Sequence, residues 1–264
     1  MERTRRNILK LFGISAVGLS AKPVFNAFAG EAGHSAVPRT EKGKNALKAK
    51  QWAMVIDTRR FHSAADLEPI IRACHQAHNV PNFENKHHEI KWLWEEEYAH
   101  AFPSKEGQFI SESVEQRPFL VMCNHCENPP CCRVCPTKAT FKRPSDGIVL
   151  MDYHRCIGCR FCMAACPYGS RSFNWRDPRK YLDMEKINRE YPTRTMGVVE
   201  KCNFCAERLA RGEQPACVEA CTDGALAFGD LDDPNSEVRK LLKSKYTIRR
   251  KPSLGTGPSV YYII

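Results

Sequence analysis

Cys156-Ile157-Gly158-Cys159-Arg160-Phe161-Cys162-Met163-Ala164-Ala165-Cys166-Pro167 is the stretch that decides how this chain folds. Its cysteines are separated by two, two and three residues and are followed by proline, which is the spacing of a [4Fe–4S] ligand run. Three thiolates in such a loop bind one cluster, and the fourth binds a neighbouring cluster. The run therefore predicts a partner group elsewhere in the chain. The alternative is zinc, which binds CxxC pairs but needs neither the third cysteine nor the proline.

Two further groups of four cysteines lie on either side of this run. They are Cys123, Cys126, Cys131 and Cys135, with Cys132 as an extra thiol, and Cys202, Cys205, Cys217 and Cys221. No CxxC pair is followed by histidine, so covalent c-type haem is not indicated. Fourteen cysteines would also suit a disulfide scaffold, but such scaffolds are usually shorter and lack this grouping into pairs. The spacing therefore favours several iron–sulfur clusters.

Composition bounds the class of protein. The chain has 264 residues, of which 42% are apolar, enough for one or two ordinary cores. Its formal charge is +10, but residues 1–29 contribute five cations and one carboxylate, which leaves +6 for the remainder. Each four-thiolate cluster adds about −2. Three clusters would bring the protein near neutrality, so we expect the basic residues to compensate buried anions and predict no nucleic-acid binding.

The N-terminus has the three regions of a secretory signal. Arg5-Arg6-Asn7-Ile8-Leu9-Lys10 precedes an apolar run to Ser20, and Ala27-Phe28-Ala29 offers a cleavage site. The paired arginines resemble the twin-arginine class, which exports folded proteins. We predict export to the periplasmic, extracytoplasmic face of the membrane. The alternative is a retained N-terminal membrane anchor. The apolar run is short for a membrane-spanning helix and is interrupted by Lys22-Pro23, which favours cleavage.

The remaining pattern predicts short strands that lead into cysteine loops and short helices. We expect a helix over residues 66–78, ended by Asn79 and Pro81, and strands over 51–58, 119–122, 147–151, 198–201, 225–228 and 254–262. Residues 30–50 are predicted to be a linker, and residues 82–115 and 174–195 to be surface excursions. The expected fold class is α+β, with metal ligation in place of much of the core.

These motifs resemble the four-cluster ferredoxin-type electron-transfer subunits of respiratory complexes, the partners of NrfD-type quinone proteins and of dimethyl sulfoxide reductase-type enzymes. The likeness covers CNHCENPPC, the opening run, CNFCAERLARGEQPAC and LGTGPSVYY, from about Trp52 onward. It implies two intertwined bacterial ferredoxin-like domains with loop insertions. The inner domain would be residues 115–197, and the outer domain residues 51–114 plus 198–264, after the 1–29 signal peptide and 30–50 linker.

In that family the last cysteine of each group crosses to a partner cluster. Carried over residue by residue, the resemblance assigns two clusters to the inner groups. Site A would be Cys123, Cys126 and Cys131 with Cys166, and site B would be Cys156, Cys159 and Cys162 with Cys135.

The chain departs from the family at its first cysteine group. In that place it has Phe61-His62-Ser63-Ala64-Ala65-Asp66-Leu67, and only Cys74, in the crossing position, remains. We therefore assign site C to Cys202, Cys205, Cys217 and Cys74, and expect three [4Fe–4S] clusters with Cys132 and Cys221 free. The alternative places Cys221 on site C and makes Cys74 an ordinary buried thiol. His62, His75 and His78 lack neighbouring thiolates in sequence and are interpreted as structural.

The sequence contains no recognisable nucleophile–base pair and no glycine-rich phosphate loop, so we predict an electron-transfer subunit rather than an enzyme. Its export signal and lost first cluster most resemble the iron–sulfur subunit (DsrO) of the Dsr membrane complex of sulfur metabolism. That resemblance implies menaquinone, an NrfD-type membrane subunit and a multihaem cytochrome c as partners, with membrane contact through those partners. Two alternatives stay open: the electron-transfer subunit of a molybdopterin oxidoreductase, and a metal-binding scaffold without redox function.

Overall fold

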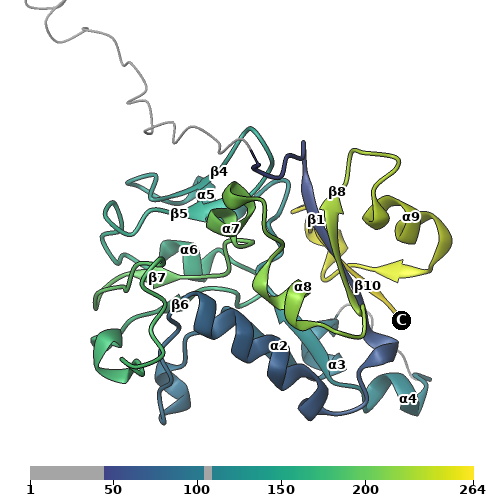
Figure 1. Ribbon diagram of the computed structural model, residues 1–264, viewed down its shortest axis with the longest axis horizontal. Helices are drawn as coiled ribbons and strands as arrows, with labels where there is room; N and C mark the ends of the chain where they lie inside the picture. The colour runs from purple at the N-terminus through teal and green to yellow at the C-terminus, as the bar shows by residue number, and fades with distance from the viewer. Residues whose placement is uncertain (1–44, 104–108) are drawn as a thin grey trace, which may run out of the picture. The chain divides into compact units, whose positions relative to one another are not determined.

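The strand β1 (Trp52–Asp57) is the centre of a four-stranded sheet in the computed structural model, which describes residues 45–103 and 109–264 (Figure 1). β10 (Val260–Ile263) pairs parallel to it, with Val260 opposite Met54, and β8 (Leu226–Asp230) pairs antiparallel on the other side. β9 (Thr247–Ile248) extends the sheet beyond β10. The predicted signal peptide and most of the predicted linker lie outside the described residues.

Both faces of β1 are buried, which is why its sequence reads as an uninterrupted apolar run. Met54 and Ile56 point into the main core together with Phe228 and Tyr262. The alternate residues, Ala53 and Val55, pack on the opposite face beneath α9 (Glu237–Ser244). The predicted strand over residues 51–58 is confirmed, one residue shorter at each end.

The helix α2 (Ala64–Ala77) is confirmed, with its start two residues earlier than predicted. Leu67, Ile70 and Cys74 are its buried face. The Asp66 carboxylate accepts hydrogen bonds from the backbone N–H groups of His62 (2.8 Å) and Ser63 (3.0 Å), so the segment that replaces a cysteine group begins a helix. The helix ends before Asn79, whose φ of 50° lies in the left-handed region.

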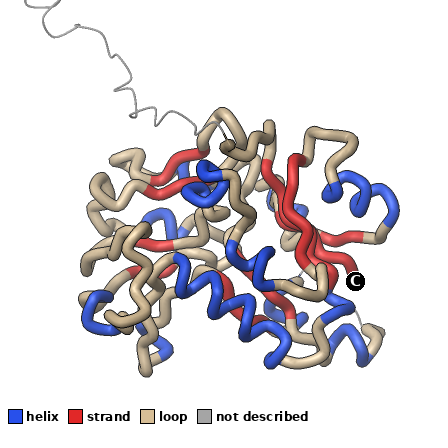
Figure 2. The backbone as a smooth tube through the Cα atoms, viewed as in Figure 1, coloured by secondary structure: helices blue, strands red, loops and turns tan. Residues whose placement is uncertain are grey.

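The part of the chain that carries the first two cysteine groups has little regular structure (Figure 2). Two-stranded antiparallel ladders join β4 to β5 and β6 to β7, and two four-residue helices, α5 and α6, follow cysteine loops. Their bounds are β4 Thr140–Lys142, β5 Val149–Met151, β6 Ser172–Phe173, β7 Val199–Glu200, α5 Pro130–Arg133 and α6 Phe161–Ala164. Helices and ladders this short are marginal by themselves.

The interpretation of residues 82–115 as a surface excursion was wrong for residues 90–102, whereas residues 82–89 and 109–115 are mostly exposed. β2 (Leu93–Glu96) pairs with β3 (Phe119–Met122), and the aromatic residues around it are buried in the main core. Trp92 is 0% exposed, and its indole N–H donates to Glu200 (2.9 Å). Phe102 packs between Phe119 and Tyr262. These aromatic side chains bury a large apolar surface in the core, and the adjacent glutamates obscured this pattern in the sequence.

The other predicted excursion, residues 174–195, is attached to the core near its C-terminal end. The amide of Asn79 donates to the carbonyls of Asn188 (2.8 Å) and Tyr191 (2.7 Å), which fixes this segment against the end of α2. The remaining elements are η1 Thr58–Arg60, η2 Lys86–His88, α3 Tyr98–Ala101, α4 Glu112–Glu115, η4 Pro178–Tyr181, α7 Ala206–Arg211, α8 Ala216–Ala220 and η5 Pro252–Leu254.

The mixture of helices and strands confirms the α+β class. β2 belongs to the predicted outer domain and β3 to the predicted inner domain, so the two predicted domains share a ladder. The domain boundaries themselves stay a prediction. Among the described residues, none of the helices combines the length and the apolar character needed to cross a bilayer.

Candidate iron–sulfur centres

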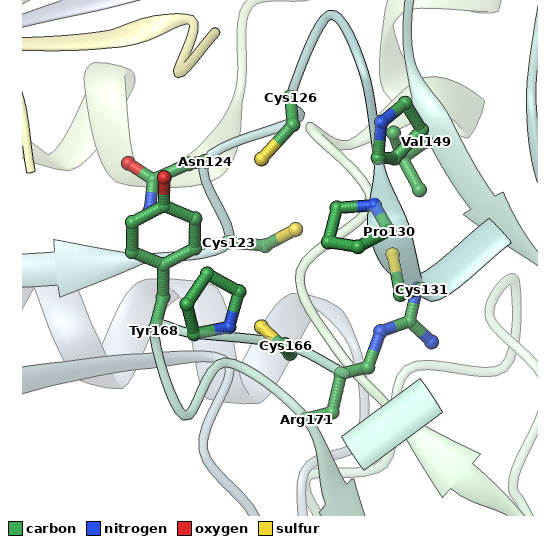
Figure 3. A pocket seen from close by; sticks show the side chains of 11 residues that line it. Cys123, Asn124, Cys126, Pro130, Cys131, Val149, Cys166, Tyr168 and Arg171 are labelled. Carbon is green, nitrogen blue, oxygen red and sulfur yellow. The ribbon is translucent and has the colours of Figure 1, made fainter. Parts of the chain in front are cut away.

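The four cysteines predicted for site A line one cavity (Figure 3). Cys123 and Cys126 lie in the loop after β3, Cys131 lies on α5, and Cys166 follows α6. In Figure 3 the four sulfur atoms point toward a common space between Tyr168 and Arg171. The empty volume there is about 310 Å³. The structure therefore brings together two segments that are well separated in sequence, as the crossing rule requires.

The four cysteines predicted for site B line a second cavity, of about 270 Å³. Cys156 and Cys159 lie in the loop after β5, Cys162 lies on α6, and Cys135 follows α5. Cys156 and Cys159 are half-buried, whereas Cys135 and Cys162 are buried. Site B is thus the more exposed of these two cavities.

The helices α5 and α6 explain how the exchange is made, because they pack against each other. Each carries the third cysteine of its own group and ends shortly before the cysteine that reaches the other cavity. Cys131 of site A and Cys162 of site B share one small apolar cluster with Val149 and Val199. The two cavities are therefore neighbours across the α5–α6 contact.

The third group lies in the main core with Cys74 beside it. α2 packs against α8, and Cys74, Cys202, Cys205 and Cys217 are all buried. Burial, followed by the nearby thiols of Cys202, Cys217 and Cys205, raises the pKa of Cys74 well above its usual range. A thiol with three such neighbours is placed as a fourth ligand would be. Cys123 of site A likewise raises the pKa of Cys202, after burial, so site C adjoins site A.

The two cysteines expected to be free lie at different places. Cys221 caps the C-terminal end of α8, half-buried, one turn beyond Cys217. Cys132 lines neither of the two cavities and lies 3.9 Å from the Thr140 hydroxyl. The choice between Cys74 and Cys221 as the fourth ligand of site C stays a prediction, and the burial of Cys74 among three thiols favours Cys74.

The first CxxC loop of each cysteine group has the same backbone feature, which the side chains do not indicate. The residue before the second cysteine is left-handed in every loop: His125 (φ 41°), Gly158 (φ 70°) and Phe204 (φ 54°). Such values cost a non-glycine residue about 1 kcal/mol or more. The turn directs backbone N–H groups at sulfur, as where the Phe204 N–H donates to Cys202 Sγ (3.5 Å). The third group therefore has the same ligand loop as the first two.

The donor sets fit [4Fe–4S] clusters better than zinc. Two neighbouring cavities each collect four thiols, and each set combines a three-cysteine loop with a cysteine from another segment. Structural zinc sites are typically built from two ligand pairs, whereas each set here takes three cysteines from one group and a fourth from another. Buried thiols that carry raised pKa values, such as Cys126 at about 12 through burial and the neighbouring Cys123, need a metal to hold them as thiolates.

Sequence reasoning did not place Arg171 or Glu207 beside the thiols, and it interpreted His78 as a structural residue. His78 is buried, lies 3.9 Å from Cys74 Sγ through Nδ1, and places Nε2 2.9 Å from the Glu207 carboxylate. Among the basic residues that flank the groups, Lys201 is buried while Arg133 and Arg160 are exposed. Arg171 is buried between the inner cavities and belongs to no motif. His62 is exposed, and the His75 ring lies 3.1 Å from the Leu93 carbonyl.

Apolar side chains occupy the region where the family carries its first cysteine group. Phe61 is 2% exposed and belongs to the same core as Leu67 and Ile70. Arg60 donates to the Asp223 carbonyl, which brings this region next to the turn after Cys221. Phe61, Leu67 and Ile70 therefore fill this region with apolar side chains.

Phe61→Ala should lower the free energy of unfolding by about 3–5 kcal/mol, because it leaves a cavity in this core. Iron content should stay at the wild-type value, since no ligand is lost. Urea unfolding of the iron-loaded protein, followed by tryptophan fluorescence under anaerobic conditions, measures the change. Phe109→Ala is the control, because Phe109 is 92% exposed and its loss should change stability by less than about 0.5 kcal/mol. Loss of iron from the Phe61 variant would contradict a purely packing role.

The known proteins that this chain resembles are iron–sulfur subunits of oxidoreductases. A family model described as a 4Fe–4S dicluster domain matches residues 117–189 and 184–231. The chain is 38% identical to the Hdr-like menaquinol oxidoreductase iron–sulfur subunit 1 of Archaeoglobus fulgidus, over 98% of this chain and 97% of that protein. It is 37% identical to the menaquinone reductase iron–sulfur cluster-binding subunit of Nitratidesulfovibrio vulgaris, over 81% and 88%. It is 32% identical to one subunit of the tetrathionate reductase of Salmonella typhimurium, over 100% and 89%.

Proposed function

Since the chain belongs to the family of iron–sulfur electron-transfer subunits of oxidoreductase complexes, we propose that it relays single electrons through three [4Fe–4S] clusters. The electrons would pass between a quinone-reactive NrfD-type membrane subunit and a second redox protein. The chain itself would not be the catalytic subunit. The same proposal includes two intertwined ferredoxin-like halves, of which the outer half has lost one cluster.

The observation that carries the proposal is the exchange of cysteines between two adjacent cavities. The clusters supply the one-electron chemistry, with potentials that the protein adjusts through hydrogen bonds, burial and charge. The chain holds the thiolates, fixes the spacing between sites, and excludes water from site C, whose four cysteines are buried. Cys131 and Cys162 belong to one apolar cluster, and Cys123 acts electrostatically on Cys202; both observations support the spatial order B, A, C.

We propose menaquinone as the quinone, because two of the relatives are named for menaquinol or menaquinone. The twin-arginine motif supports an extracytoplasmic location, where a multihaem cytochrome c would be the second redox partner in a Dsr-type complex. Membrane association would then come from the NrfD-type protein.

Purification of the native complex from membranes tests this assignment. The chain should co-purify with an integral-membrane protein and with c-type haem, measured as the pyridine haemochrome, and external protease should digest it in intact spheroplasts. Iron should approach about twelve atoms per chain, at about four per cluster. A complex without c-type haem would contradict the cytochrome partner, and protection from external protease would contradict the location.

The second candidate is the electron-transfer subunit of a molybdopterin oxidoreductase. Its support is the full-length similarity to one of the subunits of tetrathionate reductase. In that case the purified complex should contain molybdopterin, detected by the fluorescence of its oxidised form, in place of c-type haem. Zinc in place of iron in the freshly isolated protein would contradict both candidates and leave a scaffold role.

A further inference from the structure

Arg171 lies in the wall between sites A and B. It is 5% exposed and lines the cavity of site A, where Figure 3 places its guanidinium beside Cys131. One amino group donates to the Thr140 hydroxyl (2.6 Å), and the other contacts the sulfur of Met151 (3.9 Å), which lines the cavity of site B. The charge of the guanidinium also acts on the ligand sulfurs Cys131 and Cys162. A single cation therefore contacts both inner sites.

Lys201 lies between sites A and C, as Arg171 lies between sites A and B. Its side chain is 1% exposed, and the ammonium donates to the carbonyl of Val149, which lines the cavity of site A. It also donates to the carbonyl of Cys202 (2.7 Å), a predicted ligand of site C. Its charge acts on Cys131 of site A and on Cys202 of site C.

These two cations differ from an ordinary buried charge. Arg194, which is also buried, pairs with the Glu200 carboxylate at 2.6 Å. Within residues 45–103 and 109–264, neither Arg171 nor Lys201 forms an ion pair with a carboxylate, and the acceptors of their hydrogen bonds are neutral oxygens and the thioether of Met151. A buried charge without a counter-ion is expensive. The anionic groups within reach are the thiolates, so the cations are placed to balance metal clusters.

The charges near the three sites are unequal. Site A adjoins both buried cations, site B adjoins Arg171, and site C adjoins Lys201. Site C also has the Glu207 carboxylate, whose charge acts on Cys74 and Cys205. Positive charge and N–H···S hydrogen bonds stabilise the reduced cluster and raise its reduction potential, while negative charge lowers it.

We propose that Arg171 and Lys201 make the middle cluster, at site A, the most oxidising of the three. This inference rests on the proposed function, because it requires clusters at all three sites. An electron that enters from either end would then rest at site A before it leaves. The two cations are positioning residues, which act on the clusters through hydrogen bonds and charge.

Redox titration of the iron-loaded full chain, followed by electron paramagnetic resonance, tests the proposal without an activity assay. Arg171→Gln should lower the potentials of two clusters, and Lys201→Met should lower the potentials of two, with one cluster common to both pairs. We expect each shift to change the reduced-to-oxidised ratio at a fixed ambient potential by about tenfold, which is about 59 mV for a one-electron couple. The common cluster should be the one that is reduced first in the wild type.

Arg133→Gln is the matched control, because Arg133 lies two residues after Cys131 but is exposed. Solvent should screen its charge, so all three potentials should stay unchanged. If a variant loses iron, Arg171→Lys and Lys201→Gln take its place; the lysine variant should shift sites A and B downward by less, because the charge is kept.

The outcomes separate this inference from the proposed function. Fewer than three cluster signals in the wild type would overturn the cluster assignment. Three signals with no common shifted cluster, or with a common cluster that is reduced last, would overturn the inference and leave the electron-transfer role intact.

Discussion

Cys74→Ser should remove about four iron atoms of about twelve per chain, which is one whole [4Fe–4S] cluster. Cys74 is a buried residue of α2, which packs against α8, and the three remaining thiols of site C act on it. Serine is a poor ligand for iron, and a three-thiolate cluster in a core would be left without its fourth attachment. Iron analysis and the cluster signals of the anaerobically purified variant measure the loss.

Cys221→Ser is the matched control, and it should leave iron content and all signals unchanged. Cys221 follows α8 at its end and is only half-buried, near the region filled by Phe61. Both substitutions replace a cysteine in the same part of the protein, so a general effect on stability would appear in both. If the variant at 221 is the one that loses a cluster, the crossing assignment of site C is wrong.

Removal of iron should unfold the part of the chain between Cys123 and Phe173 while the four-stranded sheet persists. Its strands have two or three residues, its helices have four, and its own apolar cluster is small. Structure this short is marginal in water, so metal ligation supplies most of its folding free energy. We expect most backbone amides there to lose protection, and β1, β8 and β10 to keep it.

Hydrogen exchange with mass spectrometry, before and after chelation under reducing conditions, gives this comparison peptide by peptide. The peptides of β1 and α9 are an internal control, because they pack together in an apolar cluster that contains no cysteine. Protection of the inner peptides after complete iron removal would show that side-chain packing alone holds the fold there.

Much of this architecture could be predicted because it depends on the spacing of apolar residues and of cysteines along the sequence. The run of apolar residues from Trp52 to Ile56 and the period of Leu67, Ile70 and Cys74 identify β1 and α2 correctly. Cysteine spacing with the crossing rule of the family groups the thiols that line the two inner cavities. The spacing of the ligand cysteines is set by the geometry of the cluster, so it can be recognised in the sequence before the rest of the fold is known.

The features that were missed depend on contacts between distant segments. The buried Trp92 donates a hydrogen bond to Glu200, and no residue near Trp92 in the sequence indicates that partner. Arg171 belongs to no motif, and its place between two sites appears only when α5 and α6 pack. The left-handed backbone at His125 and Phe204 is imposed by the ligand loop, since neither residue favours it.

The pairing of β1 has a consequence for biosynthesis. Both of its neighbours, β8 and β10, come after every cysteine assigned to the three sites, so the ribosome delivers all the ligands before β1 gains a partner. Closure of so long a loop is slow, whereas α5 and α6 are close in sequence. We therefore expect the cellular machinery that inserts iron and sulfide to meet sites A and B while the sheet is still open. The last strands then fold over centres that are already loaded.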